Sequence, residues 1–244
     1  MLVILSAIAF AAQAAPLIDH PGPRIIVEGF GSAKNPPNVA TLSYSVQGEG
    51  QTSDQAVAAM VTKSAAIEGA LQSIDPSIDL RSAEVEVQAV RGNDCKQDRY
   101  DETLRLSEGE CAIKGHVAKQ EFTVRTSRVA DAGTMVGLAG RHGAFDPSIG
   151  GFRLADERDA KRQAIAAALA DARFKAEAIA ASSNAALGNV LSASLDGAVA
   201  QDIVVTGARR PQANLVAGSP VTVKVAPGPV ETTARVTVTY AISR

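Results

Sequence analysis

The sequence predicts an α+β fold, in which an antiparallel sheet with helices packed on one face is joined to a second, intimate lobe. Between residues 39 and 154, strand-like and helical segments follow one another in the order β-α-β-β-α-β. This order is typical of a split βαβ lobe with its helices on one face of the sheet. A long alanine-rich helix and terminal strands then supply the second lobe. We expect one domain of two lobes over residues 16–244.

The first lobe begins with a strand and a capped helix. Residues 39–46 place alternate apolar side chains on one face, which predicts a strand with one buried face. Thr52 and Gln55 then form a capping box, so a helix begins there. Segments 83–90 and 116–126 predict two neighbouring antiparallel strands, 128–143 a shorter helix, and 147–155 another strand. The helical repeat after Thr52 comprises Val57, Met60, Val61, Ser64, Ile67 and Leu71.

The second lobe is built around a helix of about 26 residues within 156–183. Acidic residues crowd its first turn, as the helix dipole favours. A stripe of small residues predicts close packing against a sheet or another helix. Strands follow at 189–195 and 232–242, and 197–230, with four prolines and no helical period, predicts an extended surface segment. The stripe consists of Ala160, Ala164, Ala168, Ala172, Ala176 and Ile179.

The pair Gly29 and Gly31, in a β-branched stretch ahead of these elements, has two interpretations. A phosphate-binding glycine turn needs a third glycine and a helix directly after it, and neither follows Gly31. We therefore expect these glycines to permit a bulge or a tight bend between strands. A weak anion site near Thr52 and Ser53, where a helix does begin, stays as an alternative.

The first fifteen residues predict a secretory signal. An apolar run from Leu2 to Phe10 is followed by Ala12-Gln13-Ala14, an A-x-A cleavage pattern. No Lys or Arg precedes the apolar run, which departs from the usual pattern. We expect export to the periplasm with cleavage after Ala14 or Ala15. The run is shorter than the roughly 18–20 residues that cross a bilayer, so no transmembrane segment is expected after cleavage.

Both cysteines flank one polar stretch. Fifteen residues separate Cys95 from Cys111, and in an oxidising compartment such a pair predicts a disulfide. Closing a loop of this size stabilises the fold by about 3 kcal/mol in the chain-entropy model. A redox-active or metal-binding pair is the alternative, but the sequence has no C-x-x-C spacing and only His116 lies nearby.

Little in the sequence indicates catalysis. The net charge is −2 with interspersed signs, so no nucleic-acid footprint is expected. His20, His116 and His142 have no partner at ligand spacing, and no G-x-S-x-G is present, so we predict no catalytic residues, metal or cofactor. Glu84 and Glu86 share one face of a strand, where acid–base work is possible but a solvated face is favoured.

Several spaced segments resemble one family. The stretches VEGFGSAKNPPNVATLSYSVQGEGQTSDQA, RDAKRQAIAAALADARFKAEAIAASSNAALGNVLSAS and ARVTVTYAI match, in order, the segments of the SIMPL-domain family. The resemblance implies a bacterial envelope protein of the periplasm or outer membrane, with oxidative-stress defence and oligomer formation among the family's associations. It supplies no catalytic residues. The cysteine pair and the long 197–230 segment depart from the family pattern.

Residues 201–212, QDIVVTGARRPQ, resemble the TonB box of outer-membrane transporters. Such a segment adds a strand to its partner by edge pairing, so a partner strand at Asp202, Ile203, Val204, Val205 and Thr206 is one hypothesis. An ordinary strand ending in a turn is the other, and it is favoured because the chain has no barrel.

Two functions from different classes remain. The favoured one is a non-enzymatic envelope protein that acts by self-assembly, as a homo-oligomer, or by binding an envelope protein partner, because free sheet edges need a cover. The alternative is a small-molecule-binding protein or cryptic enzyme with its site between the lobes.

Overall fold

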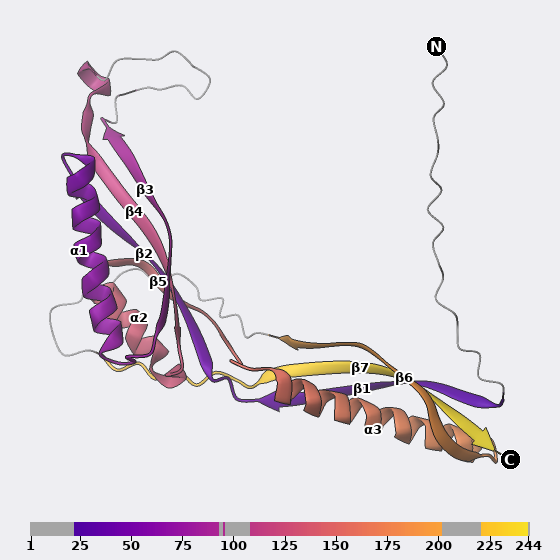
Figure 1. The fold of residues 1–244 in the computed structure, drawn as a ribbon. Coiled ribbons are helices and arrows are strands. Elements are labelled where there is room, and N and C mark those ends of the chain that lie inside the picture. Colours follow the sequence, from indigo (N-terminus) through magenta and orange to yellow (C-terminus); the bar gives the residue numbers. More distant parts are fainter. Residues whose placement is uncertain (1–21, 93–94, 96–107, 202–220, 244) are drawn as a thin grey trace, which may run out of the picture.

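The computed structural model describes residues 22–92, 95, 108–201 and 221–243. Figure 1 shows an L-shaped molecule of two lobes, each with its own sheet and helix layer. The three-stranded lobe has strand order β1-β7-β6, with every pair antiparallel. Its elements are β1 (Arg24–Asn35), α3 (Arg158–Ser182), β6 (Ala186–Gln201) and β7 (Val230–Ser243).

The four-stranded lobe has strand order β3-β4-β2-β5, again antiparallel throughout. Its chain order, β2-α1-β3-β4-α2-β5, confirms the predicted split βαβ pattern, and the two-sheet architecture confirms the α+β class. Both helices pack on one face of this sheet (Figure 1). The elements are β2 (Val39–Gly50), α1 (Ser53–Gln72), β3 (Asp79–Arg91), β4 (Ile113–Thr126), α2 (Ala132–Arg141) and β5 (Ala144–Arg153), with 3-10 turns at Gly109–Cys111 and Val129–Asp131.

The capping box at the start of α1 is confirmed. The Thr52 hydroxyl accepts a hydrogen bond from the Gln55 backbone N–H at 3.3 Å, and the Gln55 side chain accepts from the Thr52 N–H at 3.4 Å. The predicted helical repeat is only partly buried, because Val61 is exposed and Ala56 takes a core position instead. The alternation in β2 is confirmed, and its apolar face packs under α1 with Met60, Ile67 and Leu71.

The alanine stripe of α3 faces the three-stranded sheet. All five predicted alanines are buried, but Ile179 is 45% exposed and Ala180 occupies the core position beside it. Because alanine projects one methyl group, the helix axis can lie unusually close to the strands. The stripe packs on β1 and β7, where the core residues are Ile25, Val27, Ala33, Ala234, Val236, Val238 and Tyr240.

The expectation of a bulge or bend at Gly29 and Gly31 is wrong. Both lie inside β1, whose pairing with β7 runs from Arg24 to Asn35 without a register shift. The glycines instead face α3, and a Cβ at Gly29 would lie 2.7 Å from the Ala172 Cβ. At Gly31 a Cβ would lie 2.8 Å from the Ala167 carbonyl carbon. Glycine is required here because helix and strand backbones meet, not because the strand turns.

The two lobes are joined by three chain segments. One is Pro36-Pro37-Asn38 between β1 and β2, and another is residues 154–157 between β5 and α3. The third is 221–229, which precedes β7 and lies along α2, where the Val225 N–H donates to the Ala130 carbonyl at 3.1 Å. Within the segment 197–230, for which an extended surface course was predicted, β6 continues to Gln201 and 221–229 lies along α2, while residues 202–220 lie outside the described part.

The close contact between β1 and α3 predicts opposite effects for two Gly→Ala changes. Gly29→Ala should destabilise the protein by about 1–3 kcal/mol, because its methyl group overlaps Ala172. Gly69 lies at an exposed position of α1, where no atom is within 4 Å of a new Cβ. Gly69→Ala should therefore stabilise the protein by about 0.5–1 kcal/mol. Chemical denaturation of both variants measures the difference. Equal effects would contradict the proposed backbone contact.

Candidate functional site

The outer edge of β1 is closed by an ion pair on α3. Asp171 and Lys175, one turn apart, are 2.6 Å from each other. The Asp171 carboxylate accepts a hydrogen bond from the Phe30 N–H at 2.8 Å, and the Lys175 ammonium donates to the Glu28 carbonyl at 3.0 Å. The hydrogen bond from Lys175 has the largest effect on the Asp171 carboxyl group, followed by the bond from the Phe30 N–H, and together they hold the pKa of Asp171 below its usual value. The backbone groups that an edge strand would offer another chain are thus occupied at the centre of β1.

Two other sheet edges carry features that discourage pairing. The β3 edge presents charged residues and has register shifts against β4 between Ser82 and Val85 and between Val90 and Arg91. The β5 edge contains Pro147, which has no N–H to donate, and two register shifts against β2. Charges, proline and bulges all hinder the addition of a further strand.

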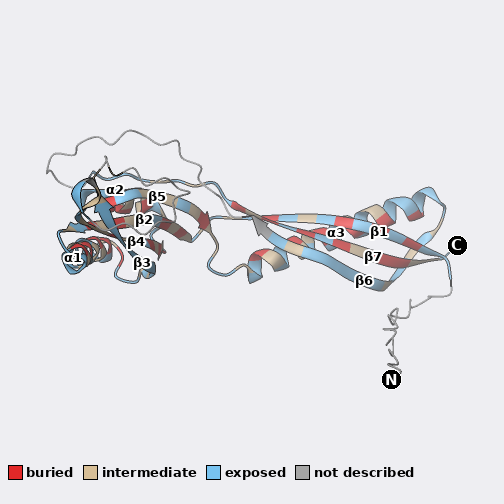
Figure 2. Cartoon of the chain, turned by 90° about the horizontal axis from the view of Figure 1, so that it is seen from above, coloured by how far each residue is buried: buried red, intermediate tan, exposed pale blue. Residues whose placement is uncertain are grey.

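The β6 edge differs from the other open edges in charge and not in regularity or exposure, since it too has register shifts, three of them against β7, and β3 is equally free of buried residues. None of its residues from 186 to 199 is buried, and Figure 2 shows the strand in exposed and intermediate colours beside the buried stripes of β1 and β7. Val190, Leu195 and Val199 are 53%, 50% and 63% exposed. The strand holds one ionisable residue, Asp196, which accepts a hydrogen bond from Thr237 of its own sheet. A long, nearly uncharged edge with exposed apolar side chains is therefore accessible.

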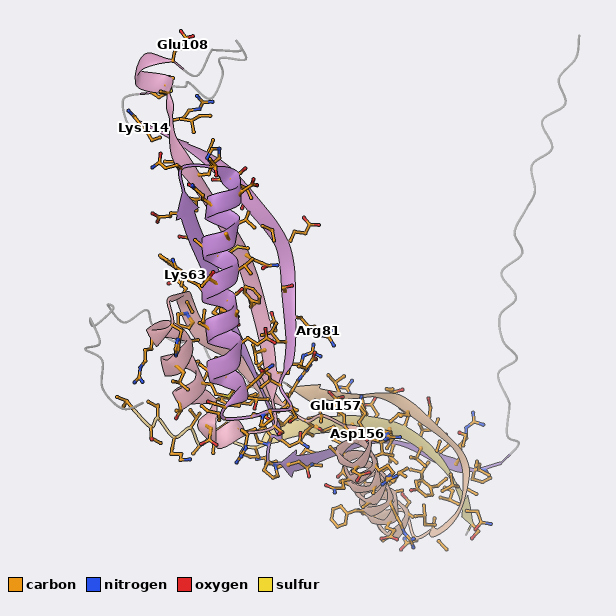
Figure 3. All side chains as sticks on the ribbon, turned by 60° about the vertical axis from the view of Figure 1, so that its left-hand side comes forward. Lys63, Arg81, Glu108, Lys114, Asp156 and Glu157 are labelled. Atoms are coloured by element: carbon orange, nitrogen blue, oxygen red, sulfur yellow. A yellow bond between two sulfur atoms is a disulfide. The ribbon has the colours of Figure 1, made fainter. Side chains whose placement is uncertain are left out.

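A cavity of about 490 Å³ lies where the lobes meet. Arg125 and Arg153, at the ends of β4 and β5, contribute one wall, and the 154–157 connection and the first turn of α3 contribute the other. Figure 3 shows two of the connection residues, Asp156 and Glu157, at this junction. The connection is held in place because the Asn38 side chain accepts the Ala155 N–H at 2.7 Å.

The cavity lining has more positive than negative groups, and they are unequally paired. Arg158 lies 2.6 Å from Asp156, and Lys161 lies 2.8 Å from Glu157. Hydrogen bonds from the Arg158 side chain and backbone lower the pKa of Asp156 to about 2, so that carboxylate is ionised at neutral pH. Both acidic residues of the lining thus already have a cation, and the remaining two cations are Arg125 and Arg153.

Beside Arg125, a buried polar network closes the base of the four-stranded lobe. Asp75, 3% exposed, accepts hydrogen bonds from the hydroxyls of Ser77 and Thr126, both at 2.6 Å. Burial raises the pKa of Asp75, but bonds from Ser77, Thr126 and the Ser127 backbone outweigh it and lower the pKa to about 2. The network therefore ties the end of α1 to the end of β4 through an ionised carboxylate.

The residues singled out in the sequence are scattered. Cys95 and Cys111 form a disulfide, and Cys111 lies between Glu108 and Lys114, which Figure 3 shows at the opposite end of the four-stranded lobe from the cavity residues Asp156 and Glu157. Glu84 and Glu86 are exposed on β3, and the His116 ring nitrogen Nδ1 lies 3.2 Å from the Gln51 carbonyl oxygen. The segment Asp202, Ile203, Val204, Val205 and Thr206, like His20 and the leader, lies outside the described residues.

No group of three or more His, Cys, Asp or Glu side chains among the described residues is placed to hold a metal ion. None of the helices in the described ranges is long and apolar enough to cross a membrane. Sequence reasoning missed the cavity, because Arg125 and Arg153 lie in separate strands and no spacing rule links them to residues 154–161.

The comparisons decide the family. A family model described as SIMPL, protein of unknown function (DUF541), matches residues 25–240. The chain belongs to the SIMPL family. No curated protein sequence in the comparison matched it.

The packing explains why the segments that resemble the SIMPL family occur together. Glu28, Gly29 and Gly31 of the first segment contact α3, which carries the second segment. In the Lys-Ala pair of that helix, Lys175 binds the Glu28 carbonyl while Ala176 is fully buried against the sheet. The third segment lies in β7, and β7 pairs with every residue of β1 from Arg24 to Asn35. Much of the sequence pattern of this SIMPL protein therefore lies in one packing unit, the three-stranded lobe, while β2 and the start of α1 in the first segment belong to the other lobe.

The Asp75 network predicts a pH-dependent effect for Asp75→Asn. The folded pKa lies below the unfolded value of about 3.9, so the ionised carboxylate stabilises the fold above about pH 4 and this contribution is lost as the pH falls toward 2. The variant should be less stable than the wild type at pH 7, with a difference that shrinks between pH 5 and pH 3. Thermal unfolding across this range measures it.

Asp159→Asn is the matched control, because Asp159 is an exposed carboxylate that pairs with Arg162 on the helix surface. Its effect at pH 7 should be small. A destabilisation by Asp75→Asn that stays constant from pH 7 to pH 3 would contradict the assignment.

Proposed function

We propose that this SIMPL protein is a non-enzymatic component of the bacterial envelope that acts by self-assembly through β6. The observation that carries the proposal is the contrast between sheet edges. β6 has no buried residue from 186 to 199 and carries only one ionisable residue there, whereas β1 is closed by Asp171 and Lys175 and the equally exposed β3 carries five charged residues. A strand edge of this kind gains backbone hydrogen bonds when another strand pairs with it.

A second copy of the chain is the partner that fits this edge. Two antiparallel β6 strands related by a two-fold axis present the same surface to each other, which is the isologous arrangement of most dimers. Val190 and Leu195 lie opposite Tyr240 and Val236 in the pairing with β7, so they share the helix-bearing face of the sheet. The dimer would bring these exposed side chains of both copies together. The near absence of charge on β6 means that self-pairing meets little repulsion.

The location of the proposed assembly rests on the leader and on the cysteines. The predicted signal at residues 1–15 supports export to the periplasm. The disulfide between Cys95 and Cys111 fits an oxidising compartment. Association with the outer membrane and a role in oxidative-stress defence come from the family resemblance alone and belong to this proposal.

A different protein partner is the second candidate. The TonB-box-like residues Asp202–Thr206 directly follow β6, so a partner strand there would extend the same edge. Deletion of 201–212 followed by pull-down with a TonB C-terminal domain tests this hypothesis. Unchanged capture after the deletion removes it.

A charged residue on β6 tests the self-assembly proposal. In light scattering after size exclusion, the oxidised protein without residues 1–15 should have the mass of two or more chains. Val190→Lys should reduce that mass to one chain, because an edge lysine opposes strand pairing.

Ile26→Lys is the control, since Ile26 is 59% exposed on β1, the strand whose edge is already closed. It should leave the assembly intact. A monomeric wild type at micromolar concentrations, or equal loss of assembly in both variants, overturns the proposal.

A further inference from the structure

We propose that the cavity between the lobes is a binding site for a small oxyanion, a carboxylate or phosphate group, held by Arg125 and Arg153. This site goes beyond self-assembly, because it lies at the junction of the lobes and not on β6.

The first support is the state of the two guanidinium groups. The Nε atoms of Arg125 and Arg153 are shielded from solvent and have no hydrogen-bond partner among the described residues. A shielded donor without an acceptor costs free energy, more so when it is charged. Arg125 has only a distant carboxylate, with its Nη1 3.7 Å from the Asp79 oxygen, and no ion pair of Arg153 is found in the described ranges. Because solvent does not reach these Nε atoms, a ligand would bind through the terminal Nη atoms, for which no hydrogen bond is found among the described residues.

The second support is the position of these arginines in the sheet. In the pairing of β2 with its neighbours, Arg125 lies opposite Thr41 and Arg153 opposite Val39. The arginines therefore flank β2 from either side, with backbones about 12 Å apart, because they are separated by two strand spacings and offset by two residues along β2. Odd-numbered residues of β2 and β4 point away from the helices, since Leu42 and Val124 are buried beneath them. Two guanidinium groups on this helix-free face can reach one ligand between them.

The third support is the charge balance of the lining. On the opposite wall Arg158 and Lys161 pair with Asp156 and Glu157, so that wall is balanced and the excess charge is that of Arg125 and Arg153. The cavity thus has an excess of positive charge that none of its own carboxylates neutralises. Arginine binds carboxylate and phosphate through parallel N–H donors, which makes an oxyanion the ligand class that fits. At about 490 Å³ the space admits a small organic anion.

A bound oxyanion would touch both lobes. Arg125 and Arg153 belong to the four-stranded lobe, and Arg158 and Lys161 to α3 of the other. The ligand would therefore add a non-covalent connection to the three chain segments that join the lobes, and binding should raise the temperature of unfolding.

The experiment uses inorganic phosphate and citrate as probes, with the oxidised protein lacking residues 1–15 and ionic strength kept constant with chloride. Isothermal titration calorimetry should show saturable binding of at least one probe, and thermal unfolding should rise with its concentration. Preference for phosphate or for citrate assigns the ligand group. Arg125→Gln and Arg153→Gln should each weaken binding by about tenfold or more, the loss expected for a charge-assisted hydrogen bond.

Arg162→Gln is the matched control, because it removes the same charge from α3 at an exposed residue that pairs with Asp159 and does not line the cavity. It should keep the wild-type affinity within about twofold. Failure of the wild type to bind either probe saturably overturns the proposal, whatever the variants do. Equal losses in Arg162→Gln and in the cavity variants overturn it as well. Light scattering on the same samples separates this result from self-assembly.

Discussion

The approach of α3 to β1 is the constraint on which the three-stranded lobe depends. The helix lies so close that Gly29 and Gly31 have no room for a side chain, and alanines form the opposing surface. At this separation α3 can do more than cover the sheet. Asp171 and Lys175 reach past β1 and bind its outermost backbone groups. The close packing of α3 on β1 therefore forms the core of the lobe and closes one of the two edges of its sheet.

Because α3 lies over β1 and β7, it leaves most of β6 uncovered. A three-stranded sheet is wider than one helix, and α3 packs mainly on β1 and β7. The side chains of β6 that share the helix-bearing face consequently remain half exposed, although Val190 and Leu195 would suit a core. The four-stranded lobe has two helices above its sheet, and its edge strand β3 carries charged residues. The asymmetry between the lobes thus follows from the number of helices available to each.

Local patterns predicted much of this fold. The capping box at Thr52 and Gln55, the alternation in β2 and the alanine stripe of α3 each depend on neighbours in sequence, and the structure contains all three. The role of Gly29 was misassigned because a glycine that bends a strand and one that admits a helix look alike in a single sequence. Only the tertiary partner distinguishes them, and that partner lies in α3.

Patterns among neighbours in sequence could not predict the cavity either. Arg125 and Arg153 come together because β4 and β5 both pair with β2, a fact of sheet order and not of spacing. The exposure of β6 was equally hidden, because its pattern predicts a strand without saying whether a second layer covers it.

The path of the chain has a consequence for how the molecule forms. The four-stranded lobe is inserted between β1 and the elements that complete the other lobe, and Arg24 finds its neighbour only at Ala241. Contacts so distant in sequence close slowly, whereas the inserted unit has its hairpins and helices near at hand. The inserted lobe can therefore fold first, and during that interval the apolar side chains of β1 stay without their partner strand β7. That interval is when a chaperone would matter most to this protein.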